Sequence, residues 1–325
     1  MELRNKNMSN EISTFHNASN RPQWIAFGLM ALFFALAPIW IYPVFLMKVM
    51  CFALFACAFN LLIGFGGLLS FGHAMFLGFA GYVSAHTAKV WGLQPEFAVL
   101  LGMLSATGLS LVTGLLAIRR QGIYFAMITL ALSQMVFFFC LQMPFTGGED
   151  GIQAVPRGAL FGVVDLSDSM NVYMFVLAIF LFGFVAIWRI VHSPFGQVLK
   201  AIRENQDRAI SLGYDVDHYK FLAFVLSGTL AGLAGATKAL VFQLASLTDV
   251  HWSMSGEVVL MTLVGGMGTL FGPVLGAAVI VSMQNYLAQM GAWVTIIQGV
   301  IFVLCVMAFR RGIVGELAHW LRKSL

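Results

Sequence analysis

The sequence contains little charge, few cysteines and none of the common nucleotide-binding or hydrolase motifs. Only 10% of its 325 residues are charged and 60% are hydrophobic, so it has too little polar surface to cover a water-soluble fold. Its 4 cysteines lie in apolar runs without CxxC or Cys/His spacing, which argues against disulfides and zinc. No Gly-Lys dipeptide, HExxH or GxSxG occurs, which excludes a Walker A loop and two common hydrolase signatures. The net charge of +4 is spread among loops and gives no indication of nucleic-acid binding.

Long apolar runs are what the sequence does contain. They recur near the ~20 residues that a helix needs to cross ~30 Å of hydrocarbon. We therefore predict an all-α polytopic membrane protein with about 8–10 transmembrane helices, some of them broken by glycine and proline or re-entrant. Seven runs predict simple spans: Trp24–Tyr42, Val44–Ile63, Leu68–Thr87, Phe97–Ile118, Ile123–Met143, Val172–Val191 and Phe221–Leu244.

Three parts follow from this distribution. Residues 1–23 are polar and are predicted to be a disordered cytoplasmic leader, because no cleavage site follows a short apolar core there. Residues 24–311 are predicted to form a single transmembrane domain with a cytoplasmic loop at 192–220. Residues 312–325 are predicted to be a cytoplasmic tail.

Basic residues predict the orientation of the chain. Arg119–Arg120, the Lys200–Arg208 block and the Arg310–Lys323 tail are expected on the cytoplasmic side. If Val258–Met283 crossed the membrane once, the tail would lie outside, against this rule. That stretch is rich in glycine and proline, so we predict that Val258–Val281 is re-entrant or crosses as two short helices. Both termini are then cytoplasmic.

A second interrupted stretch, Gly64–His73, is similar to Val264–Pro273 and enters the membrane from the opposite side in this topology. That relation is typical of inverted repeats, whose broken helices line transport sites, although glycine-rich coincidences are common in membrane helices. His73 is an ionisable residue inside the membrane, which predicts either a functional group or a histidine hydrogen-bonded to a neighbouring helix. The candidate substrate path comprises Ser70, Gly72, His73, Gly265, Gly266 and Gly268.

The most polar stretch outside the leader is His192–Tyr219, in which eight charged residues fall between Lys200 and Lys220. Ser193 is expected to cap a helix that starts at Pro194 and stops at Gly213. Its apolar face would comprise Phe195, Val198, Leu199, Ile202, Ala209 and Ile210, with a Glu204–Arg208 pair on the polar face. Such a helix is either solvated or docks into a groove on a cytosolic partner.

Three further features have structural and functional interpretations. The loop residues Thr146, Gly147, Gly148 and Asp150 could meet an extracytoplasmic partner or the substrate mouth, or form a plain turn. Gly228, Gly232 and Gly235 predict close helix approach, within the chain or with a second subunit. Lys48, Lys89 and Lys238 are expected to snorkel from outer helix ends.

Four stretches together resemble the permease subunits of branched-chain amino acid ABC transporters, in order and in spacing. They are NLLIGFGGLLSFGHAMFLGFAGY (Asn60–Tyr82), FTGGEDGI (Phe145–Ile152), AIRENQDRAISLGYDVDHYKFLAFVLSGTLAGLAGA (Ala201–Ala236) and VVLMTLVGGMGTLFGPVLGAA (Val258–Ala278). The resemblance extends from about Trp24 to Arg311.

The resemblance implies a type II-like ABC importer permease in the bacterial cytoplasmic membrane, without a cofactor and without enzymatic activity of its own. It implies a second permease subunit, as a heterodimer, two cytosolic ATPase subunits and an extracytoplasmic solute-binding protein. The expected contacts with the ATPase are Arg203, Glu204, Asp207, Arg208, Ala209, Leu212 and Gly213.

Branched-chain or hydrophobic amino acids are the cargo that the resemblance implies, and urea or short amides are the alternative. An autonomous secondary transporter or channel would need paired acids in the membrane, whereas Glu257 is the only acid near a span. A membrane enzyme is least favoured, because acids, bases and metal ligands are not clustered.

Overall fold

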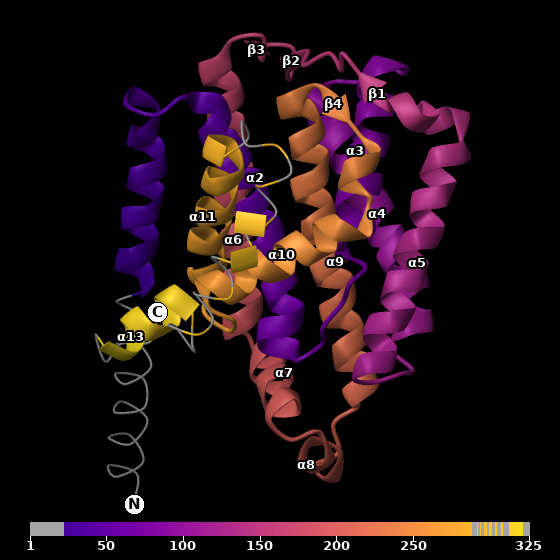
Figure 1. Cartoon of the computed structure of the whole chain (residues 1–325), viewed down its shortest axis with the longest axis vertical. Helices are drawn as coiled ribbons and strands as arrows, with labels where there is room; N and C mark the ends of the chain where they lie inside the picture. Colours follow the sequence, from indigo (N-terminus) through magenta and orange to yellow (C-terminus); the bar gives the residue numbers. More distant parts are fainter. Residues whose placement is uncertain are drawn as a thin grey trace, which may run out of the picture.

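The computed structural model describes residues 23–287, 291, 293, 296–297, 299–300, 303, 307 and 312–320. Residues 1–22 of the predicted leader, most of residues 288–311 and residues 321–325 of the predicted tail lie outside this described part. The described part is a bundle of helices with short strands at one end (Figure 1). This confirms the predicted all-α polytopic fold.

Among the described residues, five helices are long and apolar enough to cross a membrane. They are α2 (Pro43–Asn60) with its π-helical extension η2 (Leu61–Phe65), α4 (Pro95–Ala117), α5 (Ile123–Gln142), α6 (Ser169–His192) and α9 (Val216–Phe242). A shorter apolar helix spans Gln23–Ile39. Three further helices of the bundle are α3 (His73–Lys89), α10 (Trp252–Gly265) and α11 (Gly272–Leu287). Each of the seven predicted spans thus has a helix, and only the third begins much later than expected, at His73.

Proline and small polar residues fix where several of these helices begin. Pro43 and Pro95 occupy the first turns of α2 and α4, where a missing N–H costs nothing. Asp168 caps α6 by accepting from the Met170 amide, and Asp215 caps α9 by accepting from the His218 amide. These starts explain why the boundaries of the long spans could be predicted to within a few residues.

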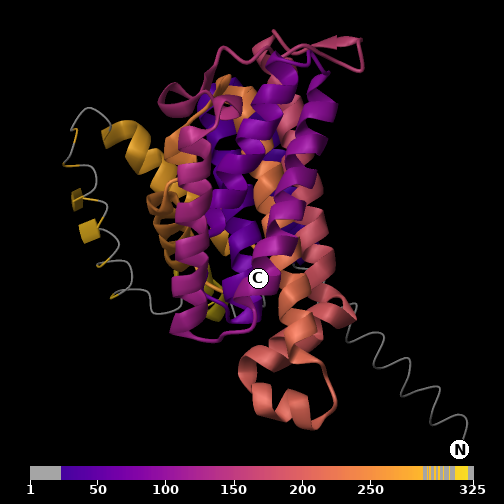
Figure 2. The ribbon, with the colours of Figure 1, turned by 90° about the vertical axis from the view of Figure 1, so that its right-hand side faces the viewer.

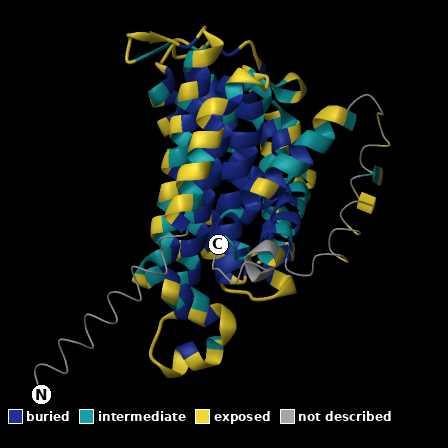
Figure 3. Cartoon of the chain, turned by 90° about the vertical axis from the view of Figure 1, so that its left-hand side faces the viewer, coloured by how far each residue is buried: buried dark blue, intermediate teal, exposed yellow. Residues whose placement is uncertain are grey.

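Burial separates central helices from peripheral ones. In the most apolar 18-residue segment of each helix, 89% of the residues are buried in α2 with its η2 extension and 78% in α9. The corresponding share is 28–39% in α4, α5 and α6. Figure 3 shows the same gradient, from dark blue at the centre to yellow along the outside of the bundle. The outer surface carries large apolar side chains, including Leu104, Val112, Met127, Met135 and Phe182. Such a surface needs lipid or another subunit against it.

Small residues bring α3, α4 and α9 into close contact. A Cβ on Gly232 would overlap the Ala106 methyl on α4, and a Cβ on Gly235 would overlap the Leu77 carbonyl oxygen on α3. Gly102 on α4 likewise faces Ala236 on α9. The close approach predicted from the glycine spacing therefore occurs within the chain.

The two ends of the bundle differ in structure (Figure 1). At one end, β1 (Ile152–Gln153) pairs antiparallel with β4 (Leu244–Ala245), and β2 (Ala159–Leu160) pairs with β3 (Val164–Asp165). We call this the strand end. At the other end, α7 (Pro194–Glu204) and α8 (Gln206–Ser211) project beyond the bundle (Figure 2).

The predicted interruption in Val258–Val281 is confirmed as a hairpin of α10 and α11, joined by residues 266–271. At ~1.5 Å per residue, these helices of 14 and 16 residues are about 21 and 24 Å long, short of a full span. They pack closely, because a Cβ on Gly276 would overlap the Met261 carbonyl oxygen. The first turn of α13 (Gly312–Trp320) lies against the hairpin, with Gly312 in contact with Gly266.

Candidate functional site

The projecting polar segment is two helices rather than the single predicted one. Ser193 caps α7 by accepting from the Gly196 amide, and Gly213 adopts φ +88° after α8, as expected. The helix breaks at Asn205, whose φ of −156° is extended and whose side chain accepts from the Arg208 amide. Asparagine competes with helical hydrogen bonds in this way. The predicted Glu204–Arg208 pair therefore does not share one helix, and no ion pair joins them in the described chain.

The break also changes which residues are buried. Ile202, Ala209 and Val216 form a small buried cluster, flanked by Val198 and Tyr219. Ile210, which was expected on the apolar face, is 53% exposed, and Leu212 is 71% exposed. Glu204, Asp207, Arg208 and Gly213 are also exposed, whereas Ala209 is not. We call the exposed set Glu204, Asp207, Arg208, Ile210, Leu212 and Gly213 the outer tip.

The inner face of α7 rests on the first helix break, residues 66–72. The guanidinium of Arg203 donates to the Gly64 carbonyl oxygen, and Leu199 packs against Gly66. The Lys200 ammonium lies 5.5 Å from the centroid of the Phe65 ring, and burial lowers the pKa of this lysine. Arg203, expected to contact an ATPase, thus contacts the membrane domain of its own chain.

The two interrupted stretches touch each other through Asn60. Its side-chain Oδ1 accepts from the Gly268 amide at 3.0 Å, and its Nδ2 donates to the Thr269 carbonyl oxygen at 2.8 Å. A Cβ on Gly64 would lie 2.7 Å from the Gly268 nitrogen. The sequence contains one signal for this link between the breaks, a polar amide near the end of an apolar run. From the sequence alone, we assign Asn60 no role. The inverted-repeat relation itself stays a prediction.

The glycines of the second break are required by its geometry. Gly266 and Gly268 have φ of 122° and 77°, a region that L-residues avoid. A Cβ on Gly265 would overlap the Gly272 carbonyl oxygen. These three members of the candidate path therefore build a tight turn beside Arg203 and Gly64.

His73 lies in a buried polar and aromatic environment at the start of α3. Its Nε2 is 2.8 Å from the Ser227 hydroxyl, which itself donates to the Ala58 carbonyl oxygen. His73 Nε2 must then be the donor, and Nδ1 has no hydrogen-bond partner in the described chain. Phe59, Phe76 and Phe224 meet the imidazole edge-on. This environment favours the packing interpretation of His73.

Ser70 and Gly72 form the loop that leads into α3. The Ser70 hydroxyl accepts from the Gly72 amide at 3.2 Å, and Ser255 on α10 accepts from the Ala74 amide at 2.9 Å. A Cβ on Gly72 would lie 2.6 Å from the Thr129 carbonyl oxygen on α5. The Thr129 hydroxyl on α5 accepts from the Phe71 amide at 3.2 Å, so side chains from α5 and α10 hold the start of α3 and tie the first break to the hairpin a second time.

The loop from Thr146 to Gly151 belongs to the strand end. Thr146 is buried and donates to the carbonyl oxygens of Cys140 and Met143. Gly147 and Gly148 have φ of 78° and 62°, so they serve the turn that places β1 beside β4. Asp150 and Gly147 are exposed, and Asp150 is the member of this set that offers a partner a charged side chain.

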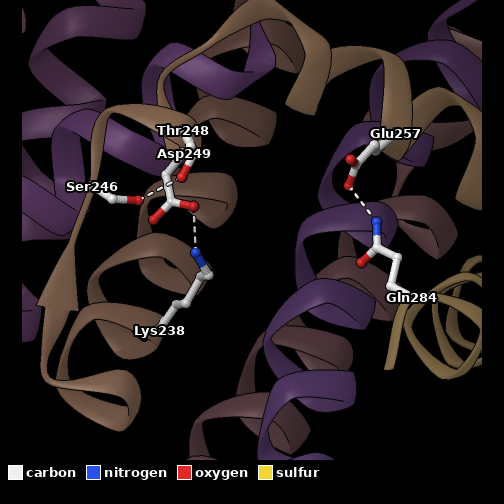
Figure 4. Close-up of polar contacts among 6 residues, drawn as sticks. All are labelled: Lys238, Ser246, Thr248, Asp249, Glu257 and Gln284. Atoms are coloured by element: carbon white, nitrogen blue, oxygen red, sulfur yellow. Dashed lines mark hydrogen bonds and ion pairs between the residues drawn. The ribbon is translucent and has the colours of Figure 1, made fainter. Parts of the chain in front are cut away.

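A cluster of charged residues near the strand end was not predicted as a site. Lys238 pairs with Asp249, and Gln284 Nε2 donates to Glu257 Oε2 at 2.9 Å (Figure 4). These four residues line one cavity, and Lys48 lines it with them. These residues come from four helices and a loop, so neither spacing nor motif in the sequence brings them together.

Fold and site together define a polytopic membrane permease whose helix breaks are linked to a projecting helical pair. The chain belongs to the family described as branched-chain amino acid transport system / permease component, whose family model matches residues 41–306. No solved structure matches the chain.

The curated relatives transport different cargoes by name. The high-affinity branched-chain amino acid transport system permease protein LivM of Escherichia coli is 25% identical over 278 residues, covering 78% of this chain and 65% of LivM. The ribose import permease protein RbsC of Bacillus subtilis is 27% identical, covering 68% of this chain and 70% of RbsC. The xylose transport system permease protein XylH of Haemophilus influenzae is 28% identical, covering 46% and 43%. The match thus spans about two thirds of the length of LivM.

Proposed function

We propose that this chain is the permease subunit of an ABC importer that moves hydrophobic amino acids into the bacterial cytoplasm. The observation that carries the proposal is the contact of Arg203 on α7 with Gly64 at the first break. Asn60 extends this connection to the second break. A displacement of α7 and α8 is therefore transmitted to both interruptions in the membrane helices.

Energy in this proposal enters from separate subunits. The sequence has no Walker A loop, so ATP is hydrolysed by two cytosolic ATPases that dock on the outer tip. The exposed side chains of Ile210 and Leu212 supply apolar anchors, and Asp207 and Arg208 supply a charged rim. Ala209 acts indirectly, because it anchors α8 to Ile202 and Val216.

The proposed orientation places α7 and α8 in the cytoplasm and the strand end outside. Lys200, Arg203 and Arg208 then lie on the side that basic residues favour. The exposed Asp150 at the strand end is placed to meet a solute-binding protein. The apolar outer faces of the bundle are placed to meet lipid and a second permease subunit, in a heterodimer.

In the proposed cycle, closure of the ATPase pair pushes α7 toward the bundle. Arg203 and Leu199 shift the first break, and the contact between Asn60 and Gly268 shifts the α10–α11 hairpin with it. The loop from Ser70 to Gly72 and the turn at Gly265–Gly268 then move together from one packed arrangement to another. The chain itself supplies the moving breaks and no chemical step.

Uptake in reconstituted vesicles tests this proposal. The complete transporter, with its ATPases and its solute-binding protein, is supplied with leucine, urea, ribose or xylose and with ATP inside or outside. The expected result is accumulation of leucine that requires ATP on the ATPase side. Accumulation by this chain alone, without ATPases, would overturn the proposed class, and ATP-driven uptake of only urea or a sugar would overturn the proposed cargo.

A further inference from the structure

A cavity of about 400 Å³ opens near the strand end between α2, α9, α10 and α11. This volume lies within the range of ~300–1,000 Å³ that is typical of small-molecule sites. Two lysines, Lys48 and Lys238, and two acids, Asp249 and Glu257, line it. Its remaining walls include aromatic side chains such as Phe52 and Phe242. The cavity thus combines equal numbers of opposite charges with an apolar lining.

One of the two possible ion pairs is already formed. The Lys238 ammonium contacts Asp249 Oδ1, and the two side chains are only 14% and 12% exposed. The same ammonium lies 5.5 Å from the centroid of the Phe52 ring and 5.9 Å from that of Phe242. Lys238 is therefore held in place by an acid and two aromatic faces, and this pair forms a fixed wall.

The other two charges are not paired with each other. Glu257 on α10 accepts from Gln284 Nε2 with one oxygen, and its Oε1 accepts no hydrogen bond in the described chain. Lys48 on α2 lines the same cavity and forms no ion pair with the described residues. Figure 4 shows the Glu257–Gln284 contact on separate helices from the Lys238–Asp249 pair. One anion and one cation are left available in a partly desolvated cavity.

We propose that this cavity binds the zwitterionic head group of an amino acid, with its carboxylate at Lys48 and its ammonium at Glu257. Charges in an apolar surrounding are costly unless they are paired, and a zwitterion pairs both at once. The hydrocarbon side chain would lie on Phe52, Phe242 and Met254. This inference rests on the proposed function and names the part of the chain that recognises its cargo.

The surface beside the cavity is hollowed as well. A second hollow of about 420 Å³ shares Lys48 and Phe242 with it. Trp40, Tyr42 and Tyr286 line this hollow. Aromatic side chains can hold a hydrocarbon group and still tolerate water, which suits the rim of such a site. A sugar has no charges to match Lys48 and Glu257, so the cavity favours an amino acid over ribose or xylose.

The alternative role of these polar contacts is to hold neighbouring helices together without binding cargo. The experiment therefore separates transport from assembly. Leucine uptake and ATPase activity are measured in vesicles that contain the complete transporter and saturating leucine-loaded binding protein. The variants are Glu257→Gln, Lys48→Met and the charge exchange Lys48→Glu with Glu257→Lys. Lys89→Met is the matched control, because Lys89 lies near the strand end, donates to the Gln153 carbonyl oxygen and does not line the cavity.

Each single variant should lower leucine uptake by about tenfold or more, as expected for the loss of one charge-assisted contact. ATPase activity and elution of the assembled complex should stay within about twofold of wild type. The exchanged double variant keeps both charges in the cavity and should recover part of the uptake. Lys89→Met should match wild type in all three measurements.

Two outcomes would overturn the inference while leaving the proposed function intact. One is unchanged leucine uptake in both single variants. The other is a parallel loss of uptake, ATPase activity and assembly without recovery in the double variant. That result would show that the charges only stabilise the packing of the helices. Failure of the wild-type transporter to move leucine would instead refute the proposed cargo.

Discussion

Arg203 donates a hydrogen bond from its guanidinium to the carbonyl oxygen of Gly64, and so joins the projecting helix α7 to the end of η2, where the first break begins. A carbonyl at a broken helix end has no intrahelical donor of its own. The arginine therefore satisfies a group that the break exposes. The same residue also faces Gly67, which has a φ of 69° that L-residues rarely adopt and where an added Cβ would lie 3.0 Å from Arg203 Cγ.

Replacing Arg203 with alanine should uncouple ATP hydrolysis from transport. The change removes a charge-assisted hydrogen bond, worth about 1.5–3 kcal/mol, at the contact that transmits movement of α7. The outer tip is unaffected, so the ATPases should still associate and hydrolyse ATP. We expect leucine uptake to fall about tenfold or more, with ATPase association unchanged in pull-down measurements.

Arg119→Ala is the control for that experiment, since Arg119 is an exposed arginine near the same end of the bundle and belongs to neither break. Its uptake should equal that of wild type. If Arg203→Ala transports normally, the contact with Gly64 has no part in coupling.

Replacing Leu212 with glutamate should prevent the ATPases from binding. Leu212 is 71% exposed, so the substitution should leave folding within about 0.5 kcal/mol of wild type. It places a charge where the proposal needs an apolar anchor. ATPase subunits should no longer co-purify, and uptake and ATPase stimulation should be lost together. Val163→Glu, at a residue 84% exposed near the strand end, should change none of these.

Much of the helix pattern could be predicted, because apolar runs and caps are local features. Ser193, Pro194 and Gly213 marked the limits of the polar segment correctly. The break at Asn205 was missed, because a helical wheel assumes continuous helix and does not weigh an asparagine side chain that caps the next turn. That single break rotated Ile210 from the expected apolar face to solvent.

Contacts between distant residues could not be predicted in the same way. Asn60 meets Gly268 across 208 positions, and nothing in either local pattern encodes the pairing. Lys48 and Lys238 both look like lysines that snorkel from helix ends, yet they line one cavity with Glu257. Recognising such a site requires knowing which helices are neighbours, and this is set by close packing rather than by periodicity.

Replacement of two helical glycines by alanine should change the stability of the protein in opposite directions, because one is closely packed and the other is not. Gly235→Ala on α9 would force a methyl group onto the Leu77 carbonyl oxygen of α3, and should cost about 1–3 kcal/mol of stability. Gly108→Ala on α4 meets nothing within 4 Å and should gain about 0.5–1 kcal/mol from helix propensity. Thermal unfolding of the purified protein should therefore move in opposite directions. A stable Gly235→Ala protein would contradict the packing of α3 on α9.

Replacing the Asn60 amide with a carboxylate should lower the stability of the protein. Asn60→Asp keeps the oxygen that accepts from the Gly268 amide. It replaces Nδ2, which donates to the Thr269 carbonyl oxygen at 2.8 Å, with a carboxylate oxygen that cannot donate. The loss should be about 1–3 kcal/mol or more, because a buried acceptor is left without its donor. Asn171→Asp, at a residue whose amide donates to the Asp165 carbonyl oxygen near the surface, should cost much less. Equal effects in thermal unfolding would show that the amide of Asn60 does not hold the two breaks together.

Replacing His73 distinguishes a role in packing from a role in transport, because the two roles predict different changes in stability and in leucine uptake. In the structure its ring fills a space bounded by Phe59, Phe76 and Phe224 and donates to Ser227. His73→Ala should therefore lower the free energy of unfolding by about 2–5 kcal/mol, the cost of a large-to-small change in a core. Leucine uptake per correctly folded transporter should stay near the wild-type value. If uptake falls tenfold while thermal stability is unchanged, His73 lines the path of the cargo and the packing interpretation is wrong.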